Sequence, residues 1–413
     1  MTHRTYNNKP IPELETSSLR GSNKVIYGKL ASLARIEKFS PKVEVWTTKA
    51  SNKSLSYFSH GIFRYFGKFP PPIARYLIDT YTSPRDLVVD PMCGSGTTAL
   101  EALLLNRKAA CYDVNPLAVL LSNVKIRKLN KSRYLEYLNE VLSSVRKKKV
   151  SSNEELVGLK NPSHWFLPET ARSLTKIKRA IQELEAPKKY KDAIMIAFLG
   201  IVRRVSRATT QQGRLFLDAV TAEQDAIPFF EKKAKSIIEP LSLLPSAGDV
   251  ACFQESVLER TPDSIIGKAD LVICHPPYFN SYKYSGVNSL ELSWLGVDHS
   301  TIRKDEVRES FKVGKPEKVS EYIADMSKGL KNLKSSLKKN GRLALMIGDT
   351  SIREKYIPVT KMLLDELKDD FSVELAAIRV PQFTEASWAA SQRRKGGQVG
   401  IKICDFIVIM KKL

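Results

Sequence analysis

The sequence has few cysteines, and their spacing excludes two kinds of protein. Only five of the 413 residues are cysteines, namely Cys93, Cys111, Cys252, Cys274 and Cys404. None forms a CxxC pair, and no histidine lies beside them at a metal-ligand spacing, which excludes a zinc finger and a dithiol redox site. Each cysteine lies in an apolar run, so we predict reduced structural thiols and no bound metal.

Long hydrophobic runs are absent as well. No segment approaches the ~18 consecutive apolar residues that cross a bilayer, and the first residues, Met1 to Tyr6, lack the apolar stretch of a secretory signal. These absences predict a cytoplasmic protein without membrane contact. The length fits one large α/β domain with an insertion, or two domains, and leaves the oligomeric state open, with a monomer as the simplest expectation.

Acidic residues are scarce relative to basic ones. The chain has 44 Asp and Glu against 66 Lys and Arg, a formal net charge of +22. Such an excess is typical of a protein whose partner carries many phosphates. Charge by itself is weak evidence, so a basic protein without a polyanionic partner is the alternative at this point.

Strand and helix patterns alternate along most of the chain, which predicts an α/β fold with a mostly parallel sheet. A final pair of β-rich stretches, 373–380 and 401–410, predicts a closing antiparallel hairpin. Asn340 and Gly341 are interpreted as the cap of the helix 320–337. The expected strands are 86–90, 109–113, 249–253, 269–274 and 342–347, and the expected helices are 73–80, 97–105, 116–125, 320–337 and 359–367.

This alternation is interrupted once. Residues 127–245 show helical periodicity, many basic residues and almost no strand signal, so we predict a helical insertion. The predicted core therefore consists of two segments, 56–126 and 246–413. Residues 1–55 are polar and without sustained periodicity, and we interpret them as a loosely attached arm.

A glycine loop follows the first predicted core strand. Gly94 and Gly96 lie between that strand and the next helix, where the backbone must turn sharply and can approach a ligand closely. Asp113 ends the following strand, where an acid can accept both ribose hydroxyls of an adenosine. Asp90 would repel a pyrophosphate but suits the cationic end of a methionine moiety. A tight turn without a ligand is the alternative.

The run from Asp90 through Asn115-Pro-Leu-Ala resembles the cofactor motifs of the amino-methyltransferase superfamily, and the segment from His60 to Pro70 resembles the one that packs over the methionine end of the cofactor. The resemblance covers 57–125 and 250–413. It implies a Rossmann-like methyltransferase fold and S-adenosyl-L-methionine as cofactor. The cofactor-binding residues that it implies are Lys68, Phe69, Pro70, Asp90, Met92, Cys93, Gly94, Gly96, Thr97, Asp113, Val114, Asn115, Glu255 and Ser256.

The motif His275-Pro276-Pro277-Tyr278 at a predicted strand end resembles the catalytic signature of methyltransferases that act on planar amino nitrogens. The exocyclic nitrogen of a base is a poor nucleophile because its lone pair is delocalised. Acceptors on His275 and on the Pro276 carbonyl can pull it toward tetrahedral geometry, two prolines make the backbone rigid, and Tyr278 offers a face for the base. Such a base must first leave the duplex.

His275 departs from the family, which usually has Asp, Asn or Ser at this position. A neutral imidazole has one acceptor nitrogen. We therefore expect turnover to fall as His275 protonates, near its ordinary pKa of ~6.5. A rigid strand-end turn without a catalytic role is the alternative for the whole motif.

The sequence from Pro276 to Tyr284, followed by Leu290-Glu-Leu-Ser-Trp-Leu-Gly296, resembles the cytosine-N4 branch of DNA methylases, and Gly348-Asp-Thr350 resembles a later core motif of the family. We predict a site-specific DNA methyltransferase that prefers cytosine N4 to adenine N6, as part of a restriction–modification system. An RNA guanine-N2 methyltransferase and a catalytically degenerate nucleic-acid-binding protein are the alternatives. Methylation at cytosine C5 is disfavoured because no Pro-Cys occurs, and zinc deamination because its ligand motifs are absent.

The helical insertion is the candidate target-recognition region, with double-stranded DNA as expected partner and a cognate restriction endonuclease as a second one. Arginines there can reach phosphates or guanine edges, although charged helix faces are usually only solvated. A basic loop near the C-terminus can clamp the backbone. The expected nucleic-acid-binding residues are Arg203, Arg204, Arg207, Arg214, Arg393 and Arg394.

Overall fold

The structure, a computed structural model, describes residues 4–27, 33–48, 50–51, 53–147, 149–150, 155–211, 214–246, 248–257, 259–279, 284–307, 318–352, 355–381 and 405–413.

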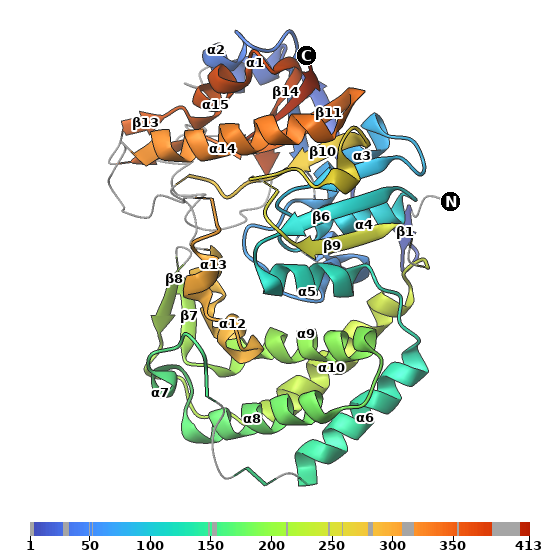
Figure 1. The fold of residues 1–413 in the computed structure, drawn as a ribbon, viewed down its shortest axis with the longest axis vertical. Coiled ribbons are helices and arrows are strands. Elements are labelled where there is room, and N and C mark those ends of the chain that lie inside the picture. The colour runs from blue at the N-terminus through green and yellow to red at the C-terminus, as the bar shows by residue number, and fades with distance from the viewer. Residues whose placement is uncertain are drawn as a thin grey trace.

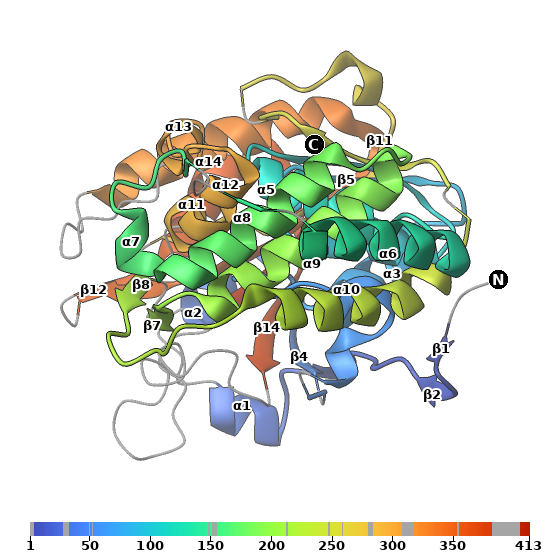
Figure 2. The same cartoon turned by 90° about the horizontal axis from the view of Figure 1, so that it is seen from below.

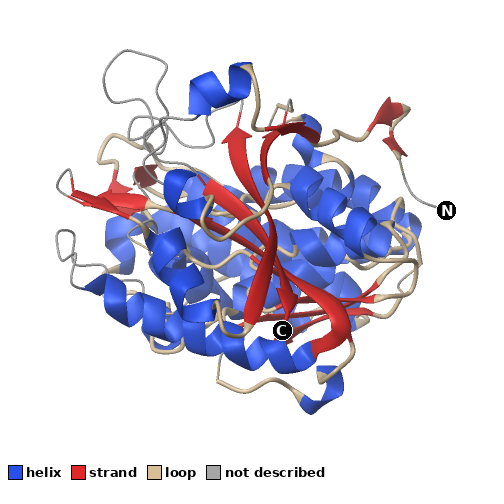
Figure 3. Ribbon diagram, turned by 90° about the horizontal axis from the view of Figure 1, so that it is seen from above, coloured by secondary structure: helices blue, strands red, loops and turns tan. Residues whose placement is uncertain are grey.

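A twisted mixed sheet runs through the centre of the molecule (Figure 3). Within the described ranges it has nine strands in the order β3-β4-β14-β15-β11-β10-β5-β6-β9. The five from β11 to β9 are parallel, whereas β15 is antiparallel to both of its neighbours. Its strands are β3 (Glu15–Ser18), β4 (Val43–Thr48), β5 (Leu87–Asp90), β6 (Lys108–Asp113), β9 (Val250–Gln254), β10 (Ala269–Cys274), β11 (Leu337–Gly348), β14 (Phe371–Pro381) and β15 (Asp405–Lys412).

The chain builds this sheet outward from β5. It first adds β6 and β9 on one side and then returns to add β10 and β11 on the other. The strand order therefore reverses between β5 and β10, which is where ligands bind in open α/β sheets. The predicted Rossmann-like fold with a closing antiparallel pair is confirmed.

Helices cover both faces of the sheet (Figure 1). Successive residues of β5 show why, because Val88 and Val89 point to opposite faces and are both fully buried. A strand buried on both faces is typical of a parallel sheet between helical layers. One layer has α3 (Pro71–Tyr81), α4 (Thr97–Leu104) and α5 (Pro116–Lys125), and the other has α14 (Val319–Leu333) and α15 (Val359–Leu367).

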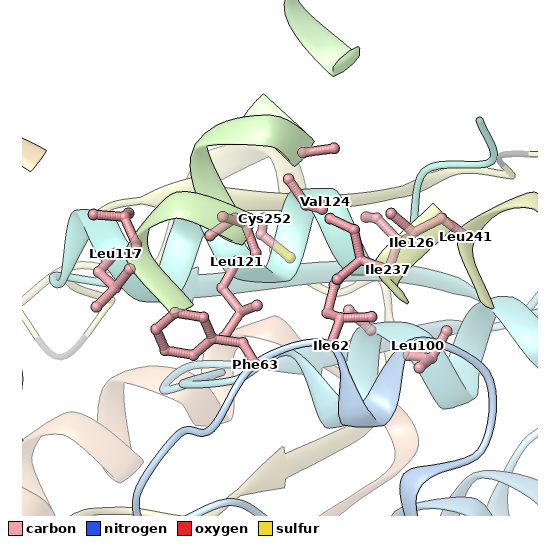
Figure 4. Close-up of a cluster of buried hydrophobic side chains, with 14 of the residues drawn as sticks. Ile62, Phe63, Leu100, Leu117, Leu121, Val124, Ile126, Ile237, Leu241 and Cys252 are labelled. Carbon is pink, nitrogen blue, oxygen red and sulfur yellow. The ribbon is translucent and has the colours of Figure 1, made fainter. Parts of the chain in front are cut away.

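Residues 127–245 are mainly helical, as predicted, and their long helices lie together in Figure 2. A short hairpin of β7 (Ala208–Gln211) and β8 (Arg214–Leu217) was not predicted. The insertion is fused to the core, because Ile237 and Leu241 of α10 join the same hydrophobic cluster as Leu121 and Val124 of α5 (Figure 4). Its helices are α6 (Lys131–Lys147), α7 (Pro162–Trp165), α8 (Pro168–Glu183), α9 (Lys188–Val205) and α10 (Ala226–Ser242).

The segment that follows the His275 motif packs on the insertion, although we assigned it to the core. It forms α11 (Tyr284–Val287), α12 (Ser289–Leu295) and α13 (His299–Ile302). The ring of Trp294 on α12 lies 5.6 Å from that of Phe166 and 5.7 Å from that of Phe198. Burying this large aromatic side chain supplies the packing energy that holds the segment there.

The N-terminal residues differ from the predicted loose arm. β4 pairs in parallel with β14, and β3 then pairs with β4, so both extend the main sheet. Trp46 explains this placement: its ring is almost fully buried and its Nε1–H donates to Glu44 at 2.7 Å. The remaining elements here are β1 (Thr5–Tyr6), β2 (Lys9–Pro10), α1 (Ser22–Tyr27), α2 (Leu33–Ile36), η1 (Ser54–Ser56) and η2 (Phe58–Gly61).

The predicted cap at Asn340 and Gly341 is wrong, because both lie within β11. Here β10 and β11 change register, and a Cβ at Gly341 would lie 2.8 Å from the carbonyl oxygen of Ala269. The glycine permits close approach of two strands and does not end a helix. The remaining elements are β12 (Thr350–Ile352), β13 (Lys355–Ile357), η3 (Asp263–Ile265) and η5 (Lys334–Ser336).

Candidate active site

A pocket opens at the carboxyl ends of β5, β6, β9 and β10, where the strand order reverses. It brings together ten of the fourteen residues implied for the cofactor and two of the four implied for catalysis. These are Phe69, Asp90, Met92, Cys93, Gly94, Asp113, Val114, Asn115, Glu255 and Ser256, with His275 and Pro277. The cofactor loop and the base motif therefore face a single cavity, although about 180 residues of sequence separate them.

The glycine loop owes its shape to tight packing. Gly94 and Gly96 both have positive φ, 49° and 71°, a conformation that disfavours other residues. A Cβ at Gly96 would also lie 2.9 Å from the Cα of Ser122 on α5. Gly96 and Thr97 thus do not line the pocket, because they begin α4 behind the loop.

Of the two acids of the loop region, Asp90 is buried and Asp113 is half-buried. The Met92 N–H donates to Asp90 at 3.1 Å, and the N–H groups of Gly94 and Asn115 donate to the two oxygens of Asp113 at 2.8 and 2.9 Å. Burial raises the pKa of Asp90 to about 7 and that of Asp113 to about 6, because these hydrogen bonds offset only part of the desolvation cost. Two desolvated carboxyls in one cavity favour a ligand with a cation and with hydroxyl donors.

Asn115 adds an unused donor to the pocket. Its Oδ1 accepts the Leu117 N–H at 3.0 Å and so caps α5, which fixes the direction of the amide. Its Nδ2 is buried and has no hydrogen-bond partner among the described residues. A buried polar atom normally has a partner. A ligand acceptor in this pocket would satisfy it.

Behind the loop lies a buried polar network that the sequence did not indicate. Lys125 donates to the Ser95 carbonyl at 2.7 Å, and Ser59 donates to the Lys125 carbonyl at 2.6 Å. Burial lowers the pKa of Lys125 well below its usual value. Nearby, fully buried Glu101 bonds to His60 at 2.7 Å and to Arg75 at 3.0 Å. These contacts fix the loop from the side opposite the pocket.

The segment before α3 forms one wall of the pocket, with Tyr65, Gly67 and Phe69 as lining residues. Lys68 and Pro70 were implied as cofactor residues but do not line it. Lys68 turns away and donates to the His60 carbonyl at 2.8 Å, and Pro70 is the N-cap residue of α3. Tyr65 and Gly67 were missed because no pattern within this aromatic-rich stretch distinguishes them.

The base motif surrounds the far side of the pocket. The His275 ring lies 5.2 Å from that of Phe69 and 5.3 Å from that of Tyr278. Tyr322 on α14 donates to the Pro277 carbonyl at 2.8 Å and so holds the double-proline turn. Tyr278 does not line the pocket, since its ring lies against Gly348, where a Cβ would be 3.0 Å away. Pro276 is buried below it.

The expectation that His275 titrates near its ordinary pKa is wrong. Burial, and next the nearby Arg379 guanidinium, lower the pKa of His275 to about 4. Arg379 is held by Asp405 at 2.9 Å on the neighbouring strand. The imidazole is therefore neutral throughout the physiological pH range and keeps one acceptor nitrogen.

Three further pocket residues come from the segment after α13, namely Asp305, Glu306 and Val307. They lie in a polar stretch between α13 and α14. Two adjacent acids in a loop carry no periodic or motif signal, so only the fold reveals that they face the cavity.

Arg203, predicted to contact nucleic acid, is paired with an acid within the protein. Its Nε and Nη2 bond to the two carboxylate oxygens of Glu291 at 3.0 and 2.8 Å, which joins α9 to α12 in a partly buried pair. Arg204 is exposed, with its guanidinium 5.9 Å from the Phe229 ring, and Arg207 is half-buried. The Arg214 side chain, Arg393 and Arg394 lie outside the described residues.

Two absences hold within the described ranges. No group of three or more His, Cys, Asp or Glu side chains there is arranged to hold a metal ion. No helix there has both the length and the apolar character needed to cross a membrane. Cys93, Cys111, Cys252 and Cys274 are free thiols and buried.

Comparisons with known proteins agree with this geometry. The sequence model of a DNA methylase family, the N6/N4 methyltransferases, matches residues 6–124. Type II methyltransferase M.MjaII from Methanocaldococcus jannaschii is 23% identical over 56% of this chain and 45% of its own. Type II methyltransferase M.BsoBI from Geobacillus stearothermophilus is 24% identical over 62% of this chain and 55% of its own. The chain thus spans about half the length of these curated relatives.

Among solved structures, TrmN from Thermus thermophilus is 11% identical with a TM-score of 0.32, over 84% of this chain and 49% of that one. The fold assignment rests on the strand order and not on this likeness. The matched residues 6–124 contain the glycine loop, Asp90 and Asp113. The glycine loop lies inside the family match, and three curated type II methyltransferases are 23% to 24% identical to this chain, so the chain is similar to the N6/N4 DNA methylases.

Proposed function

We propose that this chain is an S-adenosylmethionine-dependent methyltransferase that modifies an exocyclic amino nitrogen of a flipped base in DNA, with cytosine N4 preferred to adenine N6. One observation carries the proposal: the glycine loop and the His275 motif line the same pocket at the switch point of the sheet. A methyl donor and an amino acceptor must meet in one cavity for direct transfer.

The charge of the pocket supports a cationic cofactor. Its lining includes five carboxyl residues, and among the described residues that line it there is no Lys or Arg, although the chain carries a net charge of +22. Asp90 suits the ammonium of the methionine end, Asp113 the ribose hydroxyls, and the Nδ2 of Asn115 an acceptor on the adenosine. Bound there, S-adenosylmethionine supplies an electrophilic methyl group.

The residues at the end of β10 suit an amino nitrogen as acceptor. Neutral His275 can accept one N–H of the base, and the rigid Pro276–Pro277 backbone can present a carbonyl for the other. The Pro276 carbonyl is the proposed second acceptor, because the Pro277 carbonyl already accepts a bond from Tyr322, although of the two prolines only Pro277 lines the pocket. Accepting both N–H groups draws the nitrogen lone pair out of conjugation, which makes the nitrogen nucleophilic. Phe69 and His275 leave an aromatic wall for stacking.

The helical layer of residues 127–245, with α11 to α13 packed on it, is the proposed target-recognition part. Residues 303–307, which follow α13, reach the pocket lining, and exposed Arg204 lies at the end of α9 that Arg203 joins to α12. The relatives that match are type II methyltransferases, which favours a role for this chain in a restriction–modification system with a cognate endonuclease.

The experiment is transfer of label from tritiated S-adenosylmethionine to duplex DNA or to RNA, followed by identification of the labelled nucleoside. N4-methylcytosine is the expected product, and a His275→Ala variant is expected to bind the cofactor but to transfer no label. N6-methyladenine would correct the target atom, label in RNA alone would overturn the substrate, and cofactor binding without transfer to either would overturn the enzymatic function.

A further inference from the structure

A short segment crosses between the two halves of the molecule next to the pocket. We call residues 303–307, which follow α13, the strap. Just before it, Ile302 is 5% exposed and belongs to the hydrophobic cluster that the helical insertion shares with the α5 face of the sheet. At its end, Val307 is 7% exposed and belongs to the separate cluster on the α14 face of the sheet, with Phe279 and Tyr322. Each end is thus fixed by burial in a different core.

Between these fixed ends the strap reaches the pocket, where Asp305 and Glu306 are lining residues. Asp305 is exposed and Glu306 half-buried. Asp90, Asp113 and Glu255, at the carboxyl ends of the strands, line the same pocket. The strap therefore adds two acids to a cavity that already holds three, in a chain with a net charge of +22.

We infer that the strap completes the cofactor site and that Asp305 and Glu306 make it prefer the sulfonium cofactor to the uncharged thioether product. This inference rests on the proposed function. Transfer of the methyl group forms a C–N bond to the base nitrogen and breaks the C–S bond, the sulfur keeps the bonding electrons, and the nitrogen loses one proton to solvent. S-adenosylhomocysteine thus has one positive charge fewer than S-adenosylmethionine. Carboxylates that line the pocket attract the sulfur only while it carries the methyl group, so the product is held less tightly.

The size of the effect follows from Coulomb's law. For charges ~8 Å apart in a partly hydrated cavity, each carboxylate is expected to favour the sulfonium by about three- to tenfold. The Kd for S-adenosylhomocysteine contains no such contribution from the sulfur. The ratio of the two Kd values isolates the sulfonium charge, because adenosine and amino-acid contacts are common to both ligands.

The test is calorimetric titration of wild type, Asp305→Asn, Glu306→Gln and the double variant with both ligands at low and high salt. Asp263→Asn is the matched control, since this exposed acid pairs with Arg260 at 3.0 Å and does not line the pocket. We expect each strap variant to lower the preference for S-adenosylmethionine by at least threefold and the double variant by about tenfold. The control should not change it. The preference of the wild type should shrink in high salt.

Equal weakening of both ligands, or no change in either, would overturn the inference while leaving the proposed function intact. Failure of the wild type to bind either ligand would overturn both. Circular dichroism and thermal unfolding of each variant establish that it is folded, because a neutral isostere at an exposed position is expected to leave the unfolding temperature within about a degree.

Discussion

Replacement of Asp90 should change stability and cofactor binding in opposite directions. Asp90 is 4% exposed, and burial raises its pKa to about 7. The folded protein therefore binds this proton more tightly than the unfolded chain does, so stability falls as the pH rises from about 4 to about 7. An increase of about three pKa units corresponds to a cost on the order of 4 kcal/mol above pH 7.

Asp90→Asn removes that cost and should stabilise the protein at pH 8. The amide brings its own unsatisfied polar atoms, so a gain on the order of 2 kcal/mol is the realistic expectation. The same change removes the carboxylate proposed for the methionine ammonium. Loss of a charge-assisted bond is expected to weaken S-adenosylmethionine binding by about 10- to 100-fold.

The pH dependence provides the sharper measurement. If binding requires the Asp90 carboxylate with a pKa of about 7, protonation of Asp90 alone should raise the Kd about 16-fold between pH 7.0 and 5.5. In Asp90→Asn this component should vanish, leaving only the roughly fourfold rise contributed by Asp113, whose pKa is about 6. Calorimetric titration over this range, with thermal unfolding at pH 5 and 8, measures both effects. A variant that binds as tightly as wild type, or a wild-type Kd that stays constant from pH 7.0 to 5.5, would refute the role of Asp90.

Three further outcomes are expected. Single-turnover methyl transfer at saturating cofactor should be flat from pH 5.5 to 8, because the pKa of His275 is about 4; an inflection near 6.5 would show that the imidazole is not desolvated. Gly96→Ala should lose cofactor binding and about 2–4 kcal/mol of stability, since its Cβ meets Ser122 and its φ is positive, and unaltered unfolding and titration curves would contradict this. Arg203→Ala should lower stability by about 3 kcal/mol by leaving Glu291 buried and unpaired, whereas Arg204→Ala should weaken duplex binding and its salt dependence without lowering stability; the reverse pattern would restore Arg203 as a DNA contact.

The α/β core could be predicted because its signals are local. Helix α5 falls on the predicted residues, 116–125, since Asn115 and Pro116 mark its start and the apolar period its length. The glycine loop and the His275 motif are contiguous, so their chemistry was visible before the fold. The predictions that failed concern contacts between distant parts of the sequence. β4 is a strand because it pairs with β14, more than 300 residues away, where Trp46 lies opposite Arg379, and no local pattern encodes that pairing.

The direction in which each side chain points could not be predicted from the sequence either. Arg203 and Arg204 are neighbours with the same chemistry, and helical geometry turns one to Glu291 and the other to solvent. Similarly, Lys68 and Phe69 are adjacent, but only Phe69 faces the pocket. The pKa of His275 depends on its burial in the fold and next on Arg379, a residue about 100 positions downstream, so the ordinary value was the only one that the sequence could support.

The glycine loop explains how the fold tolerates two desolvated acids. Its outer side faces the pocket, where Asp90 and Asp113 are placed to bind a ligand with a cation and hydroxyl groups. The desolvation of these two acids lowers the stability of the folded protein. The inner side of the loop is held by Lys125, which donates to the Ser95 carbonyl, and by the packing of Gly96 against Ser122. A loop fixed from behind cannot relax to hydrate the acids in front of it. Ligand binding then recovers electrostatic energy that the folded protein already stores, which is the sense in which a binding site is pre-organised.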